Sequence, residues 1–237
     1  MLVMSQIAKS YITSTVETRA VSAIDLHVKQ GEFVALSGPS GSGKTTLLNI
    51  AGLLEPTDTG TYHLDGRDVS SLSDRQRSRL RSELIGFIFQ GFNLLPDLSV
   101  LDNIELPLRL RGLKSSDRCA RSAKALATVG LSNRASHYPA QLSGGQQQRI
   151  AVARAIAGDP KLILADEPTG NLDSVMSAQI MELLREINRA GTTIVMVTHD
   201  VEHARSAARR VVIRDGRLQE DSAAPVAVPA LSPAAAA

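Results

Sequence analysis

The chain has 237 residues, 43% of them hydrophobic and 21% charged, so it can bury a normal globular core. Its 26 Lys and Arg residues nearly balance 24 Asp and Glu residues, which argues against a surface dedicated to nucleic acid or anionic lipid. A single cysteine, Cys119, excludes an intrachain disulfide and a cysteine-based metal site. The sequence shows no secretory leader and no long apolar run, so we expect any role at a membrane to depend on a partner.

The N-terminal part of the chain predicts short strands separated by turns. The patterns that indicate them are β-branched and apolar runs bounded by Gly and Asp. Strands are expected over residues 2–4, 23–28, 33–36, 60–64 and 85–89. Asp65-Gly66 predicts a hairpin turn, and Ser73 is a suitable N-cap for a basic helix over residues 74–84.

The C-terminal part predicts helices alternating with buried strands. Continuous apolar runs at 161–165 and 192–197 alternate with helical patterns at 146–157 and 174–190, which favours a parallel sheet in an α/β fold. Residues 99–158 show no convincing strand, and a helix is expected over 118–129. We therefore expect one domain over residues 1–221, with core segments 1–90 and 142–221 and a helical insert over about 91–141. The Ala/Pro-rich residues 222–237 are expected to be disordered.

A glycine-rich loop between the strand at 33–36 and a helix at 46–51 has the spacing of a phosphate-binding loop. The glycines let several backbone N–H groups point at one anion, and the helix N-terminus adds its partial positive charge. Lys44 can reach the β- and γ-phosphates, and the Thr45 hydroxyl can ligate Mg²⁺. The alternative, a glycine-rich surface turn, does not explain why both flanks fit. The predicted nucleotide-binding residues are Gly38, Pro39, Ser40, Gly41, Ser42, Gly43, Lys44, Thr45 and Thr46.

Two carboxylates, Asp166 and Glu167, follow the apolar strand at 161–165. Ligands of a parallel sheet bind at the carboxyl ends of its strands. We expect Asp166 to hold Mg²⁺ and Glu167 to orient the attacking water as a general base. A solvated acidic turn is the alternative.

A second glycine-rich segment opens the helix at 146–157 and offers another anion site of bare N–H groups. Its residues are Leu142, Ser143, Gly144, Gly145 and Gln146. An ordinary serine N-cap is the alternative. A γ-phosphate held by the first loop leaves little room for a second loop of the same chain, so a partner chain is the expected source of that second loop.

With these motifs in their order and spacing, residues 2–220 resemble the nucleotide-binding subunit of an ATP-binding-cassette (ABC) transporter. The resemblance implies a phosphate-loop NTPase core with an N-terminal antiparallel β region and an inserted α-helical subdomain. It implies ATP and Mg²⁺ as ligands and a head-to-tail homodimer in which residues 142–146 act on the partner's nucleotide. By the same resemblance Gln90 is a Mg²⁺ and water ligand, Asn171, Leu172 and Asp173 form the loop that the family calls the D-loop, and His199 contacts the γ-phosphate. Tyr11 could stack on adenine, although an edge-strand tyrosine is a close alternative.

Residues 86–96 and 170–173, with the arginine-rich helix at 75–81, resemble the lipoprotein-releasing and macrolide-exporting ATPases. This implies a peripheral ATPase on the cytoplasmic face of the membrane, coupled to a membrane-spanning permease. We expect a groove near residues 92–98, lined by Phe92, Leu94, Leu95 and Leu98, to receive a helix of that permease. Packing of these residues in the core is the alternative there. A cell-division signalling ATPase of the same build is an alternative function, and a soluble DNA-repair or translation ATPase is a more distant one, since no nucleic-acid surface is expected.

Overall fold

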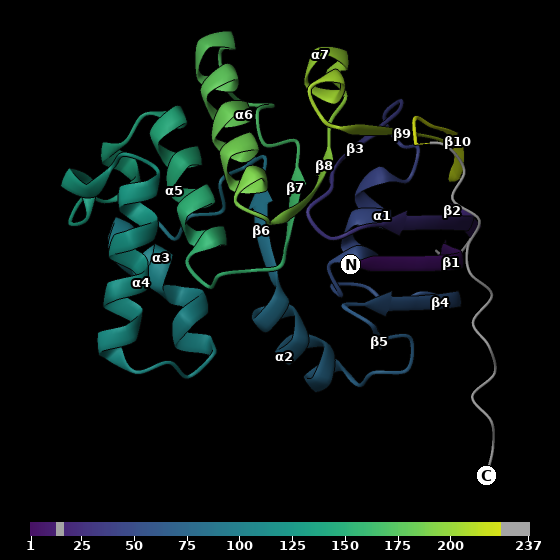
Figure 1. The fold of residues 1–237 in the computed structure, drawn as a ribbon, viewed down its shortest axis with the longest axis horizontal. Coiled ribbons are helices and arrows are strands. Elements are labelled where there is room, and N and C mark those ends of the chain that lie inside the picture. The colour runs from purple at the N-terminus through teal and green to yellow at the C-terminus, as the bar shows by residue number, and fades with distance from the viewer. Residues whose placement is uncertain (13–16, 224–237) are drawn as a thin grey trace.

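The structure is a computed structural model that describes residues 1–12 and 17–223. Two sheets lie side by side, and helices cover the larger sheet on both faces (Figure 1). The expected disordered tail at 222–237 falls, from residue 224 onward, outside the described residues. No helix of the described chain is long and apolar enough to cross a membrane.

The smaller sheet is antiparallel, and its strand order over the described residues is β2-β1-β4-β5. Its strands are β1 (Leu2–Ile12), β2 (Glu17–Val28), β4 (Thr59–Leu64) and β5 (Arg67–Asp68). The expected turn joins β4 and β5: Asp65 and Gly66 both have positive φ, 51° and 75°, as a two-residue hairpin turn of type I′ requires. Alternate residues of β1 are buried, so one face of this sheet packs on the core.

The larger sheet has the order β10-β9-β3-β8-β7-β6 over the described residues. Its strands are β3 (Phe33–Ser37), β6 (Ile85–Phe89), β7 (Leu162–Asp166), β8 (Thr193–Val197), β9 (Arg209–Arg214) and β10 (Arg217–Asp221). The pairs β3–β8, β3–β9, β6–β7 and β7–β8 are parallel, and β10 is antiparallel to β9. The predicted α/β fold is thus confirmed, although β9 and β10 were not expected.

A serine or aspartate side chain caps five of the helices of the described chain, and the other two begin without a side-chain cap. The helices are α1 (Lys44–Ala51), α2 (Asp74–Leu84), α3 (Val100–Leu110), α4 (Ser115–Thr128), α5 (Gly144–Ile156), α6 (Ser174–Arg189) and α7 (Val201–Arg205), with 3-10 turns at Ser132–Arg134 and Pro139–Gln141. Ser73 caps α2 as predicted and forms a capping box with Gln76. In the described structure only helices and 3-10 turns, and no strand, lie between β6 and α5. The division into a core and a helical insert stays a prediction.

Two hydrophobic clusters fill the core, one on each face of the larger sheet. Along β3, Val34 and Leu36 join the cluster that contains α1 and the smaller sheet, whereas Phe33 and Ala35 join the cluster that contains α3 to α6. This alternation explains why the strand is apolar at successive positions: both of its faces are buried. It also places α1 on one face of the sheet and α5 on the other.

Candidate functional site

The phosphate loop connects β3 to α1 and is shaped by close backbone approach at two glycines. At Gly38, with φ 144°, an added Cβ would lie 2.0 Å from the Ile213 carbonyl oxygen. At Gly43, with φ 96°, it would lie 2.1 Å from the Ala20 carbonyl oxygen. Gly43 is also the N-cap of α1 and gives it no side-chain cap, so the first N–H groups of the helix remain available to an anion.

Lys44 lies across this loop. Its ammonium group donates to the carbonyl oxygens of Gly38 at 2.9 Å and Pro39 at 2.7 Å, and the residue is only 7% exposed. Burial lowers the pKa of Lys44, while the nearby Glu167 and Asp166 carboxylates oppose that shift. A positive charge is therefore held at the centre of the loop, where a phosphate would compensate it.

Asp166 ends β7 beside Thr45, the second residue of α1. Burial raises the pKa of Asp166, the adjacent Glu167 charge raises it further, and a hydrogen bond with Thr45 lowers it. A half-buried carboxylate near a hydroxyl, with a second carboxylate next to it, is a donor set of hard oxygen atoms. These residues fit the Mg²⁺ expected from the sequence, because a cation would relieve the repulsion between the two carboxylates.

Glu167 follows Asp166 and is held in a strained backbone conformation, with φ 45°. Its N–H donates to the Val197 carbonyl oxygen at 3.0 Å, which ties it to β8. Its carboxylate lies 2.9 Å from Nδ1 of His199, the residue expected to contact the γ-phosphate. The carboxyl ends of β7 and β8 therefore bring these two predicted residues together.

Gln90, directly after β6, contacts the predicted D-loop at residues 171–173. The Asn171 side chain donates to the Gln90 carbonyl oxygen at 3.0 Å, and the Gln90 amide lies 3.5 Å from the Asn171 side-chain oxygen. Gly170 leaves room for this contact, since an added Cβ there would lie 2.8 Å from Nε2 of Gln90. Leu172 packs against the helical core and Asp173 caps α6 by accepting from the Met176 N–H.

Residues 142–146 form the start of α5, on the sheet face opposite α1. Ser143 caps the helix, and its N–H donates to the Gln146 side-chain oxygen at 3.0 Å in a capping box. Gly145 packs closely against Met176, because an added Cβ would lie 2.6 Å from Sδ of that side chain. The structure therefore does not bring the two glycine-rich segments of one chain together (Figure 1).

Tyr11 lies near the end of β1, 39% exposed, and its hydroxyl donates to Glu55. Burial and that bond raise the pKa of Tyr11, whereas a hydrogen bond with Thr46 lowers it. Its ring is therefore held beside the first turn of α1, next to the phosphate loop.

Two residues of α5 that sequence reasoning missed contact the loops around this site. Gln148 is fully buried and donates to the Pro168 carbonyl oxygen at 2.6 Å, just after Glu167. Arg154 donates to the carbonyl oxygens of Phe92 and Asn93, just after Gln90. Neither has a sequence signal of its own, because each partner lies at least 20 residues away along the chain.

Comparison with known proteins agrees with this geometry. Residues 21–170 match the family model described as "ABC transporter". The chain is 48% identical to the uncharacterized ABC transporter ATP-binding protein YknY of Bacillus subtilis (strain 168), over 92% of this chain and 95% of that protein. It is 45% identical to the macrolide export ATP-binding/permease protein MacB of Marinobacter nauticus, over 93% of this chain but 34% of that longer protein.

Among solved structures, the chain superposes with a TM-score of 0.86 and 40% identity on the dimeric post-hydrolysis state of the ATP-binding cassette MJ0796 bound to ADP and Pi, covering 94% of this chain and 98% of that one. A second dimeric structure of MJ0796, described as a bacterial ABC transporter cassette, matches with the same TM-score at 41% identity. The chain therefore belongs to the ABC transporter family and is an ATP-binding, ATP-hydrolysing cassette.

Proposed function

We propose that this ATPase drives a membrane-spanning partner of the macrolide-exporting or lipoprotein-releasing kind, by ATP-dependent closure of a head-to-tail homodimer. The observation that carries the proposal is the separation of the two glycine-rich segments onto opposite faces of one sheet. A complete site then needs residues 142–146 of a second copy. The dimeric structures of the similar cassette MJ0796 support this assembly.

In this mechanism the adenine stacks on Tyr11, and the phosphates bind the N–H groups of residues 38–46 and the Lys44 ammonium. Thr45, Gln90 and Asp166 would hold Mg²⁺, which when bound would neutralise charge on the phosphates. Glu167 accepts a proton from the attacking water, and His199 fixes the orientation of its carboxylate through their hydrogen bond.

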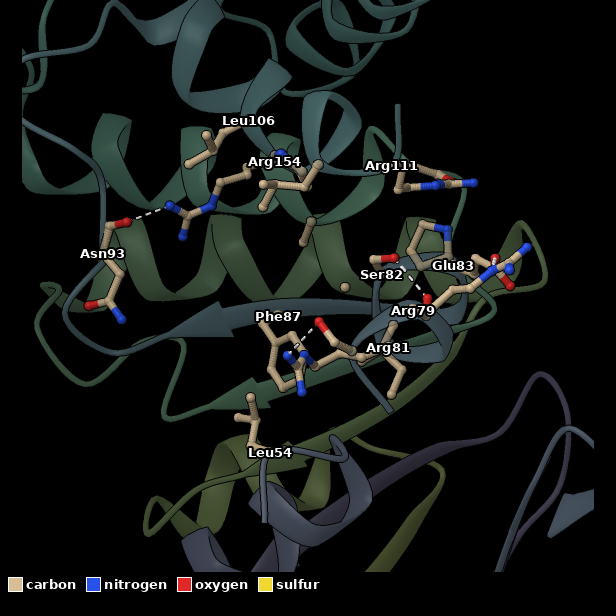
Figure 2. A pocket seen from close by; sticks show the side chains of 18 of the residues that line it. Leu54, Arg79, Arg81, Ser82, Glu83, Phe87, Asn93, Leu106, Arg111 and Arg154 are labelled. Carbon is tan, nitrogen blue, oxygen red and sulfur yellow. Dashed lines mark hydrogen bonds and ion pairs between the residues drawn. The ribbon is translucent and has the colours of Figure 1, made fainter. Parts of the chain in front are cut away.

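The partner would dock in a groove of about 1230 Å³ between α2, β6 and α3. Figure 2 shows it, with arginines and apolar side chains facing one space. Its apolar lining includes Leu54, Phe87, Phe89, Leu106, Leu110 and Leu113. Its charged lining is Arg75, Arg79, Arg81, Arg111, Arg154 and the single acid Glu83. Of residues 92–98, where we expected the groove, only Asn93 lines it.

Packing explains why the groove does not lie along residues 92–98. Leu94 packs against the helical core, and the exposed large apolar side chain of this segment is Leu95, at 45%. The excess of arginines over one carboxylate favours an amphipathic helix that carries acidic residues beside its apolar face. We propose such a helix of the membrane partner as the occupant. The position of the chain at the cytoplasmic face of the membrane follows from this proposal.

Affinity purification of the tagged chain from native membranes tests the proposal. A membrane protein should co-purify with it, and Leu110→Glu should weaken that capture by about tenfold or more, because it places a like-signed carboxylate against the acidic helix and removes an apolar contact. Leu110 is 79% exposed, so folding should survive. Ile12→Glu is the matched control, since Ile12 is 82% exposed on the smaller sheet. Equal capture of both variants would reject the groove, and a cell-wall hydrolase regulator as the captured partner would favour the signalling alternative.

A further inference from the structure

The turn that follows Gln90 has an unusual backbone. Phe92 and Asn93 both have positive φ, 61° and 50°, and the Asn93 N–H donates to the Gly91 carbonyl oxygen at 2.6 Å. Two consecutive non-glycine residues rarely adopt this conformation, and a bulky phenylalanine is a marked outlier. Such a turn persists only where the surroundings hold it.

Arg154 holds the turn through two hydrogen bonds. From near the end of α5 its guanidinium donates to the Phe92 carbonyl oxygen at 2.8 Å and to the Asn93 carbonyl oxygen, the contact drawn in Figure 2. One planar group thus bonds both strained residues at once, which a lysine ammonium does with poorer geometry. Burial lowers the pKa of Arg154. Its guanidinium is bonded to these two carbonyl groups although the side chain also lines the groove of Figure 2.

The turn lies between two segments of the proposed mechanism: Gln90, and residues 142–146, which are proposed to act on the nucleotide of a second copy. On one side Gln90 contacts Asn171 and Gly170. On the other side the Phe92 ring lies against Gly144, where an added Cβ would be 3.7 Å from Cζ of Phe92. Because the turn follows Gln90 directly, we expect its relaxation to ordinary backbone angles to displace Gln90 more than the phosphate loop.

We propose that Arg154 is a positioning residue for ATP hydrolysis, which holds the turn at residues 91–93 so that Gln90 keeps its place at the nucleotide. This inference rests on the Mg²⁺ and water role proposed for Gln90. It goes beyond that role by assigning the geometry of the site to a residue 64 positions farther along the chain, on the helix that begins at residues 142–146.

Steady-state ATPase measurements on the full chain, with thermal melting of each variant, test the proposal. Arg154→Gln should lower kcat by about tenfold, the value of one or two lost charge-assisted hydrogen bonds, and leave KM for ATP within about twofold. Arg154→Lys should fall between Arg154→Gln and the wild type. Arg149→Gln is the matched control: Arg149 is on the same helix and donates to the Val129 carbonyl oxygen at 3.2 Å and to Gln179 at 2.7 Å, away from the turn.

Rescue by glycine makes the test specific. Glycine adopts positive φ without cost, so Asn93→Gly should restore part of the kcat of Arg154→Gln, with Asn93→Gly alone as the reference for that comparison. A merely structural arginine would lower the melting temperature and the active fraction, without a rescue that depends on the turn. Should Arg154→Gln fail to fold, the same comparison is made with Arg154→Lys.

These variants test the role of Gln90 and the role of Arg154 separately. Normal turnover of Gln90→Ala would reject the role of Gln90, whatever Arg154 does. A slow Gln90→Ala with a normal Arg154→Gln and Arg154→Lys would overturn the role of Arg154 alone. A fall in kcat with no recovery on adding Asn93→Gly would also overturn it, because the turn would not be what Arg154 controls.

Discussion

Replacement of Glu167 by Gln removes the general base with the smallest change of shape. The amide keeps a side-chain oxygen for the contact with His199, and the backbone bond of residue 167 to Val197 is untouched. Burial raises the pKa of Asp166 and the Glu167 charge adds to that shift, so removing the Glu167 carboxylate also relieves a repulsion. We therefore expect the variant to fold with a melting temperature equal to or slightly above that of the wild type.

Turnover should fall by about 10²–10⁴-fold, which corresponds to about 3–5 kcal/mol in the barrier. Phosphate release measures kcat, and a fluorescent nucleotide measures ATP affinity, which should be retained because Lys44 and residues 38–46 are unchanged. With ATP and Mg²⁺ the variant should accumulate as a dimer in size-exclusion chromatography. Glu202→Gln, on an exposed carboxylate of α7, is the control and should hydrolyse ATP normally. Near-normal turnover of Glu167→Gln would refute the assignment of the base.

Three further changes probe the surroundings of the site. Tyr11→Ala should raise KM for ATP by about tenfold, since base stacking on an aromatic ring is worth about 1–3 kcal/mol, while Tyr11→Phe should stay near the wild type; equal KM values would exclude stacking. Tyr62→Phe should destabilise the fold by about 1 kcal/mol, because the buried Tyr62 hydroxyl donates to the Ala51 carbonyl oxygen at 2.7 Å, and chemical denaturation would show a lower midpoint. The pKa of His27 is lowered below 6.5 by burial and, to a smaller extent, by the charge of the Met1 amino group. As pH falls, the unfolded chain therefore binds a proton before the folded chain does, and the fold loses stability below about pH 6.5. His27→Gln should lose less stability than the wild type between pH 7.5 and 5, and parallel melting curves at each pH would contradict this.

The sequence predicted the parts of the fold whose signals are local. Residues 33–36 and 161–165 read as buried strands because they are apolar at successive positions, and the glycine spacing at 38–43 needed no partner to be recognised. The same holds for the predicted Ser73 cap, which satisfies an N–H group within the first turn of its own helix. Ser143 also caps its helix, α5, which the sequence analysis had considered only as the alternative for that segment.

Elements stabilised by distant partners were missed or shortened. β9 begins with two arginines and does not read as a strand, yet Arg209 is held by Asp221 at 2.6 Å and by Glu32 at 3.3 Å. β1 and β2 are longer than expected, because the polar residues at the C-terminal end of β1 pair with those at the N-terminal end of β2. Pairing of this kind replaces local propensity, so periodicity does not reveal it.

The residues of the site also divide into those with a local sequence signal and those positioned by distant partners. The residue types and spacings identified the loops, whereas the side chains that set their relative positions gave no signal. Gln148 and Arg154 each bond a backbone carbonyl group, and a carbonyl group is present at every position of any sequence. Such contacts are visible only once the chain has folded.

Action of residues 142–146 on a second copy is tested by mixing two inactive variants. Ser143→Arg should bind ATP but not turn it over, because a bulky cation blocks approach to the neighbouring nucleotide, and Lys44→Ala should lose its own phosphate site. If the two segments act in trans, a mixed dimer has one site with both lesions and one with neither, so an equal mixture should recover up to about a quarter of wild-type activity. If they acted within one chain, every site would carry one lesion and the mixture would stay inactive. Since α1 and α5 pack on opposite faces of the sheet, we expect recovery. Phosphate release from the mixture, against each variant alone, decides between the two, and cross-linked mixed dimers without any activity would contradict the head-to-tail assembly.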